Sequence, residues 1–155
     1  MIRQYGSKMC FVCGVDNPIG LHLDFWIDGE QVWTDFTPGA AHQGYPGVMH
    51  GGLAATVLDE TMGRAAALKH LWMFTAKMEI TYRRPVPLGQ TLRAVSRIDE
   101  LRGSRMLASG QILLPDGTPA VEGKGLYLRV PEGQLEQFLA ELREQGMDVS
   151  RFAQT

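Results

Sequence analysis

The segment from 42 to 63 holds the residues whose types and spacing could do chemistry. His50-Gly51-Gly52 precedes a run with helical spacing, and Asp59 follows His50 by nine residues. The first amides of a helix have no internal partner and lie at the positive end of the helix dipole, and glycine lets a ligand approach them closely. Such amides can stabilise a carbonyl oxygen that gains charge during nucleophilic attack. Asp59 is then the candidate base or nucleophile.

A purely structural interpretation of the same residues stays open at this point. His50-Gly51-Gly52 could be no more than a joint between a loop and a helix, and Asp59 could pair with Arg64 or cap a neighbouring element. A carboxylate in an apolar helix indicates catalysis only as a matter of probability. The choice depends on the elements that position these side chains.

The apolar pattern predicts strands and two helices of different character. Apolar residues nearly encircle the first helix, which indicates burial, whereas the second helix is amphipathic. Because only one long helix precedes the second run of strands, a sheet curled around a central helix fits better than a doubly wound fold. In chain order we predict strands at 21–27 and 32–36, a buried helix at 51–70, strands at 76–82, 90–100, 104–114 and 120–130, and a surface helix at 132–145.

Four stretches, in order along the chain, together resemble one known family. The first is Cys10-Phe11-Val12-Cys13-Gly14 with Asn17-Pro18 and Gly20-Leu21, and the second is Gln43-Gly44 with Pro46-Gly47. The third is His50-Gly51-Gly52 with Asp59, and the last is Thr75-Ala76 with Ile80, Tyr82 and Arg84-Pro85-Val86-Pro87. They are similar to motifs of hotdog-fold thioesterases of the PaaI-like, phenylacetate-degradation type. The resemblance extends from about Cys10 to Val130.

This resemblance implies an α+β hotdog fold, in which an antiparallel sheet wraps around one long central helix, with a C-terminal amphipathic helix in addition. It also implies an acyl-CoA thioesterase, which hydrolyses a thioester to a carboxylic acid and free coenzyme A without a cofactor. We expect residues 1–155 to form a single domain, with an N-terminal arm at 1–20 and the C-terminal helix at 132–145. The motifs do not specify the acyl group.

The resemblance also implies catalytic roles for four residues. Asp59 corresponds to the family's catalytic carboxylate, acting as general base or nucleophile, and the Gly51 amide to the group that polarises the thioester carbonyl. His50 corresponds to a histidine that orients the acyl group or supports the oxyanion. Thr75 falls where some members, including mammalian acyl-CoA thioesterases, carry a hydroxyl that helps catalysis.

One position departs from the family pattern. Some relatives carry Asn or Gln six residues before the histidine of the HGG motif, where it holds the attacking water or the carbonyl. This chain has Gly44 there, with Gln43 adjacent. We therefore expect Gln43 to take the substrate-binding role after a one-residue shift, beside Gly52 at the entrance of the site.

Arginine supplies most of the positive charge, and six arginines lie between 83 and 105. Because arginine suits phosphate recognition and coenzyme A carries a 3′-phosphate and a diphosphate, we expect Arg83 and Arg84 to bind substrate. The alternative is a solvated sheet face in which the arginines pair with Asp99 and Glu100.

The spacing of Gly51 and Asp59 predicts an oligomer. Eight residues on one helix span about 12 Å, but amide and carboxylate must both lie within about 3–4 Å of one carbonyl. Two antiparallel copies of the helix would bring Gly51 of one chain to Asp59 of the other. We therefore expect a homodimer or a dimer of dimers, with active sites at the subunit interface.

Two other functions and a metal site compete with this interpretation. Asp16-Asn17-Pro18 with His22 resembles a hotdog hydratase or dehydratase motif, although its spacing is six rather than five residues. A non-catalytic acyl-CoA-binding module is the other alternative. Cys10 and Cys13 have the spacing of half a zinc site, to which only His22 and His42 could add. We expect no metal and interpret both cysteines as small buried residues of the arm.

Composition excludes several classes of protein. The chain has 155 residues, 45% of them hydrophobic, with 15 basic and 17 acidic side chains and a net charge of −2. A nucleic-acid-binding domain normally has a basic excess, and no segment reaches the roughly 18 apolar residues of a membrane span. We therefore expect no nucleic-acid partner, no membrane partner and a cytoplasmic location, where both thiols stay reduced.

Overall fold

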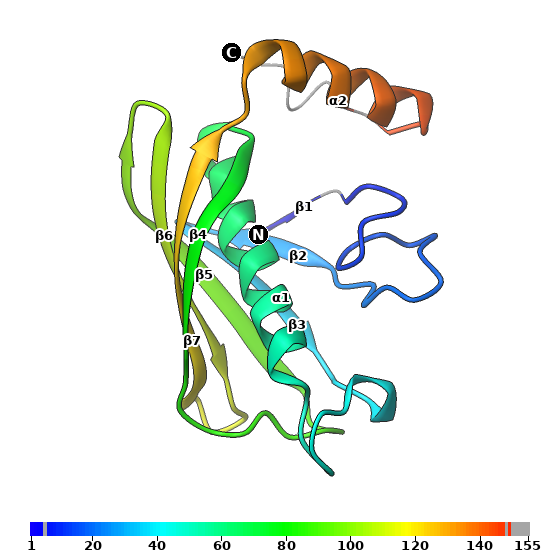
Figure 1. Cartoon of the computed structure of the whole chain (residues 1–155), viewed down its shortest axis with the longest axis vertical. Coiled ribbons are helices and arrows are strands. Elements are labelled where there is room, and N and C mark those ends of the chain that lie inside the picture. Colours follow the sequence, from blue (N-terminus) through cyan, green and yellow to red (C-terminus); the bar gives the residue numbers. More distant parts are fainter. Residues whose placement is uncertain (5, 148, 150–155) are drawn as a thin grey trace.

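A seven-stranded antiparallel sheet curves around one helix in the computed structural model, which describes residues 1–4, 6–147 and 149 (Figure 1). The strand order is β1-β2-β3-β5-β6-β7-β4. This arrangement confirms the predicted α+β hotdog fold. The elements are β1 (Ile2–Gln4), β2 (Phe25–Asp28), β3 (Gln31–Phe36), the 3-10 helix η1 (Ala40–His42), α1 (Gly51–Gly63), the 3-10 helix η2 (Arg64–Lys69), β4 (Met73–Tyr82), β5 (Leu92–Arg102), β6 (Arg105–Leu113), β7 (Pro119–Arg129) and α2 (Glu132–Glu144).

Helix α1 is buried against the sheet because its apolar residues meet glycines there. Leu58 and Met62 are fully buried. A Cβ atom at Gly110 of β6 would lie 2.9 Å from Met62 Cγ, and one at Gly123 of β7 would lie 3.0 Å from Met62 Cε. The two glycines therefore let α1 approach the sheet closely, which fixes the position of every side chain on it.

The N-terminal region differs from the prediction in two ways. The predicted strand 21–27 begins only at Phe25, because His22 has a φ of 55° and interrupts the extended backbone. The amides of Leu21 and Leu23 bond instead to the carbonyls of Phe11 and Val12. In addition, part of the predicted arm forms β1, which pairs with β2.

Both predicted helices are present with changed bounds. The helix predicted at 51–70 is α-helical to Gly63 and continues as η2 to Lys69. Helix α2 ends one residue before the prediction, and Gly146 follows it with a φ of 79°. No helix among the described residues is long and apolar enough to span a membrane.

Strand β4 is at one edge of the sheet, and within the part of the chain that the structure describes it pairs with β7 alone. It begins three residues before the prediction and contains a register shift between Thr75 and Lys77. The predicted alternation, with Ala76 on the apolar face, is therefore wrong at its start, and Ala76 is exposed. The shift is a bulge, in which one extra residue changes the face to which its neighbours point.

Candidate active site

The N-terminus of α1 presents one backbone amide that is not used internally. The ring Nδ1 of His50, the N-cap, accepts a 2.9 Å hydrogen bond from the Gly52 amide. The amides of Leu53 and Ala54 donate to the His50 carbonyl, at 3.0 and 3.1 Å. Among the hydrogen bonds of the described residues none uses the Gly51 amide, which makes it the candidate oxyanion donor. Because Nδ1 accepts, the proton of a neutral His50 ring is on Nε2, where it can donate to a ligand.

The loop before α1 explains the glycine at position 44. A Cβ atom there would lie 3.0 Å from His50 Cα, so Asn or Gln at this position would press on the backbone of the N-cap. Gln43 is exposed, and its Oε1 accepts a hydrogen bond from the Gly47 amide at 3.1 Å. In this structure the Gln43 side chain therefore stabilises the loop that leads to the helix.

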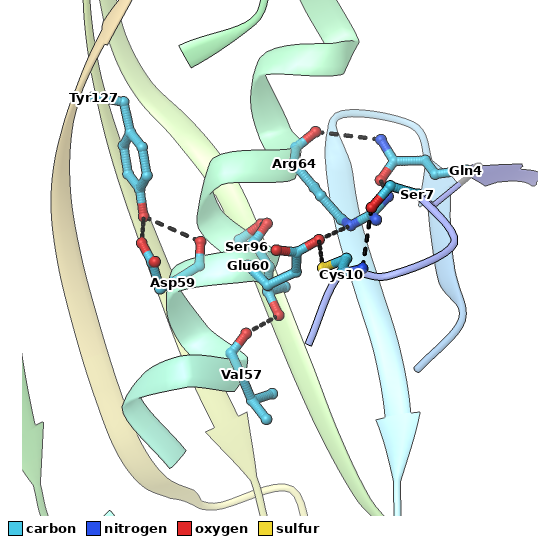
Figure 2. A network of polar contacts seen from close by, with 10 residues as sticks. Gln4, Ser7, Cys10, Val57, Asp59, Glu60, Arg64, Ser96 and Tyr127 are labelled. Carbon is cyan, nitrogen blue, oxygen red and sulfur yellow. Dashed lines mark hydrogen bonds and ion pairs between the residues drawn. The ribbon is translucent and has the colours of Figure 1, made fainter. Parts of the chain in front are cut away.

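Asp59 lies in the middle of α1 and is held by two hydroxyl groups from neighbouring strands. Thr75 Oγ1 of β4 donates to Asp59 Oδ1 at 2.7 Å. The hydroxyl of Tyr127, on β7, lies 3.2 Å from the same oxygen and 3.3 Å from the Asp59 carbonyl (Figure 2). Both side-chain contacts use Oδ1, so Oδ2 is available to act on a water or on a carbonyl carbon.

Tyr127 was not among the residues predicted from sequence. Its side chain is 1% exposed, and burial together with the charge of Asp59 raises the pKa of its hydroxyl. The hydroxyl therefore stays protonated and donates to Asp59. The only sequence signal was a tyrosine on the apolar face of the last strand, where a buried hydroxyl needs a partner.

The bulge in β4 is what turns Thr75 toward Asp59. Side chains of a regular strand alternate between the two faces of the sheet. Glu79 and Thr81 line the outer face, so in a regular strand Thr75 would point outward as well. The extra residue between Thr75 and Lys77 reverses this parity and brings Thr75 onto the face of α1. Bulges commonly redirect side chains in this way beside active sites.

Asp59, Thr75 and Tyr127 line a cleft of about 660 Å³. Its walls are mostly apolar and come from several elements, among them β1, β2, η2 and α2. They include Ile2, Ile27, Ala67, Leu71, Trp72 and Leu142. Two carboxylates, Asp59 and Glu60, line this cleft, and its apolar walls suit an acyl chain whose reactive carbonyl lies at Asp59.

The structure separates the predicted site residues into two groups within one chain. Asp59 and Thr75 lie at the cleft. His50, Gly51 and Gly52 lie at the N-terminal end of α1, outside the residues that line this cleft. There the hydroxyl of Tyr82 donates to the Gly51 carbonyl at 2.7 Å. Strand β4 thus contacts both groups, through Thr75 at one end and Tyr82 at the other.

Arg83 and Arg84 do not lie at the cleft. Arg83 points to the outer face of the sheet, where its Nε is 2.6 Å from Glu122 Oε2 and holds the pKa of that carboxyl below its usual value. A guanidinium nitrogen of Arg84 donates to Thr118 Oγ1 at 3.4 Å. Both side chains are exposed at the C-terminal end of β4, on the side of Gly51.

The residues of the hydratase-like motif hold the N-terminal arm together. Asn17 Oδ1 accepts from the Ile19 amide, and its Nδ2 donates to the Met9 carbonyl. His22 Nε2 lies 2.5 Å from the Asn17 carbonyl. None of these contacts places a carboxylate against a ligand-sized cleft, so this motif has a structural role here.

The comparisons with known proteins agree with this geometry. Residues 46–120 match the family model "Thioesterase superfamily". A crystal structure of a thioesterase superfamily protein superposes with a TM-score of 0.74 at 28% identity, over 78% of this chain and 60% of that one. The chain therefore has the hotdog fold, and its residues 46–120 are similar to the thioesterase superfamily.

Two further proteins are similar to this chain, one in fold and one in sequence. PaaI of E. coli, from the phenylacetic acid degradation operon, superposes with a TM-score of 0.67 at 19% identity, over 72% of this chain and 81% of PaaI, and so shares its fold. Acyl-coenzyme A thioesterase THEM4 of Mus musculus is 33% identical over 137 residues, 86% of this chain and 59% of the mouse protein. The chain spans about half the length of the curated relatives it matches.

Proposed function

We propose that the protein is an acyl-CoA thioesterase that hydrolyses its substrate to a carboxylic acid and free coenzyme A. The observation that carries this proposal is the Asp59 carboxylate, held by Thr75 and Tyr127 at the wall of a mostly apolar cleft. The activity named for its mouse relative is the same. No cofactor takes part in this reaction.

Asp59 and the Gly51 amide divide the chemistry between them. In one route, Asp59 removes a proton from a water that attacks the thioester carbonyl carbon. In the other route, Asp59 attacks that carbon itself, and loss of the thiolate leaves an anhydride that water hydrolyses. In both routes the carbonyl oxygen becomes negative and accepts a hydrogen bond from Gly51. The C–S bond then breaks, and the leaving thiolate needs little assistance because the pKa of its thiol is about 8.5.

The partner subunit would supply the second half of each site through β4. This ten-residue edge strand pairs with β7 on one side only, and long unpaired edges normally acquire a partner or a protecting device. A two-fold axis near Met78, the middle of β4, would pair the strand with its copy in antiparallel orientation. The Thr75 end, with Asp59, would then face the Tyr82 end of the partner, with the partner's Gly51.

The remaining predicted residues would bind the rest of the substrate in this dimer. His50 and Gly52 adjoin Gly51, and Gln43 forms a β-bridge with Met49, two residues before Gly51. These residues would contact the thioester group and the pantetheine arm. Arg83 and Arg84 follow Tyr82 and would extend toward the phosphates of coenzyme A. The apolar cleft behind Asp59 would take the acyl chain.

Substitution of Asp59 by alanine tests the proposed activity. The parent protein should release coenzyme A from members of an acyl-CoA panel, and Asp59→Ala should lower this rate by orders of magnitude with the melting temperature retained. Unchanged hydrolysis in the variant would reject Asp59 as the catalytic group. A parent protein that binds acyl-CoA without turnover would be a binding module, and hydration of an enoyl-CoA would indicate a hydratase.

Heterodimers test whether the site is shared between subunits. Two differently tagged chains, one with Asp59→Asn and one with Gly51→Pro, are co-expressed and purified through both tags. A shared site leaves one of the two sites intact, so about half of the wild-type activity should remain. The matched control carries both substitutions in one chain, opposite a wild-type chain. It should be inactive if sites are shared and half-active if each chain holds a whole site.

A further inference from the structure

Three possible metal ligands from two distant parts of the sequence meet beside α1. Cys10 and Cys13 come from the N-terminal arm and Glu60 from α1, and their ligand atoms all lie within 4.8 Å of one another. Cys10 Sγ lies 4.0 Å from Glu60 Oε1 (Figure 2). All three side chains are partly buried. The cysteines, interpreted from sequence as small buried residues, therefore have a carboxylate between them and the helix.

The backbone around the cysteines has the shape of a preformed sulfur chelate. The Gly14 amide donates to the Cys10 carbonyl at 2.8 Å and closes a turn that contains both cysteines. A Cβ atom at Gly14 would lie only 2.5 Å from the backbone of Cys10. A Cβ at Gly6 would lie 2.6 Å from Cys13 Sγ. The two glycines therefore let the backbone pack closely around both cysteines.

The surroundings of the three ligands also suit a cation. Arg64 Nε donates to Glu60 Oε1 at 2.8 Å, and ligating carboxylates commonly have such a second partner. Ser7 Oγ accepts from the Cys10 amide at 3.2 Å and fixes the start of the turn. Two thiolates and the Glu60 carboxylate carry three negative charges. A divalent cation and the Arg64 guanidinium together carry three positive charges and would balance them.

We propose that Cys10, Cys13 and Glu60 bind one thiophilic divalent cation, with zinc as the expected ion. Binding releases the two thiol protons and forms two metal–sulfur bonds and one metal–oxygen bond, and water or a small ligand fills the fourth position. His22 and His42, the other ligands considered from sequence, instead bond to the Asn17 carbonyl and the Gly39 amide.

The cation would join the arm to the helix next to the candidate catalytic group. Glu60 adjoins Asp59 in sequence, and Gln4 and Ser7 of the arm line the same cleft as Asp59. A metal at this point would hold one wall of that cleft in place. The site is independent of the proposed thioesterase activity, because none of its ligands takes part in the reaction.

Titration of the reduced, chelator-treated protein with Co²⁺ tests the site directly. Co²⁺ bound by thiolates in a tetrahedral site gives a sulfur-to-metal charge-transfer band and intense visible bands, which one equivalent of Zn²⁺ should abolish. Cys13→Ser should remove the charge-transfer band. Glu60→Gln should retain both thiolates and weaken Co²⁺ binding by about tenfold or more.

A matched control separates the site from general effects of charge. Glu100→Gln changes an exposed glutamate that also pairs with an arginine, Arg102, and it should leave Co²⁺ affinity unchanged. Circular dichroism of each metal-free variant checks that the fold is intact. The proposal is wrong if the reduced parent protein gives no charge-transfer band. Unchanged affinity in Glu60→Gln would also overturn it, because the helix would then supply no ligand.

Discussion

Replacement of Gly51 by proline removes the proposed oxyanion donor and little else. Gly51 is the first residue of α1, a position at which proline is favoured because the amide has no partner inside the helix. The preceding residue, His50, has φ −58° and ψ 130°, which is the conformation that a following proline prefers. The amides of Gly52 and Leu53 keep their bonds to His50, so the helix start is preserved.

The structure sets the expected size of the effect. Loss of one oxyanion donor lowers kcat by about 100- to 1,000-fold, or about 3–4 kcal/mol of transition-state stabilisation. Proline in a compatible conformation raises stability by about 0.4–1 kcal/mol. The Cβ at position 51 would lie 3.3 Å from Tyr82 Cε1, a tight contact that offsets part of this gain. The rate should therefore fall steeply while the melting temperature changes little.

Release of coenzyme A, measured with a thiol reagent, gives the rate, and thermal unfolding gives the stability. Glu132→Pro is the matched control, since Glu132 is the exposed first residue of α2 and follows Pro131 at φ −58° and ψ 143°. It should leave both quantities close to wild type. If Gly51→Pro retains hydrolysis within about threefold at an unchanged melting temperature, the Gly51 amide is not the donor.

Three further substitutions test the groups around the two halves of the site. Tyr127→Phe removes a hydroxyl that lies 3.2 Å from Asp59 Oδ1 and helps to hold this carboxylate in place, so kcat/KM should fall about tenfold. Ser96→Ala, which also deletes a buried hydroxyl bonded to α1, should lower the melting temperature similarly but leave kcat/KM close to wild type. Thr75→Val should lower kcat about 10- to 100-fold, with Thr75→Ser restoring most of it; equal rates in both variants would contradict a role for the hydroxyl. Arg84→Ala should raise KM several-fold for acyl-CoA but not for an acyl thioester without phosphates, and an equal rise for both would exclude phosphate binding.

The sequence alone predicted those features that depend on local periodicity. The apolar surface of 51–63 indicated a buried helix because its period is a property of one segment. Each alternating segment likewise predicted a strand, although the boundaries moved by one to four residues. The position of Gly51 at the helix start was also predictable, since a glycine pair before a helical pattern defines that start.

The features that were missed depend on contacts between distant segments. Tyr127 and Asp59 are 68 residues apart, and no pattern in either segment indicates that the two meet. Glu60 and Cys10 are 50 residues apart, so no local pattern indicates that Glu60 lies beside the cysteines. The bulge beside Thr75 is set by pairing with β7, which a strand pattern does not encode.

The bulge gives β4 a role that a regular strand could not have. Without the extra residue, Thr75 and Tyr82 would point to opposite faces of the sheet, because they are seven residues apart. With it, both point toward α1, and one strand contacts Asp59 at one end and Gly51 at the other. The same strand offers the free edge through which a second copy would pair in antiparallel orientation. Strand β4 therefore holds the two halves of the proposed site at its two ends. A two-fold axis near Met78 would place the Asp59 half of one chain next to the Gly51 half of the other.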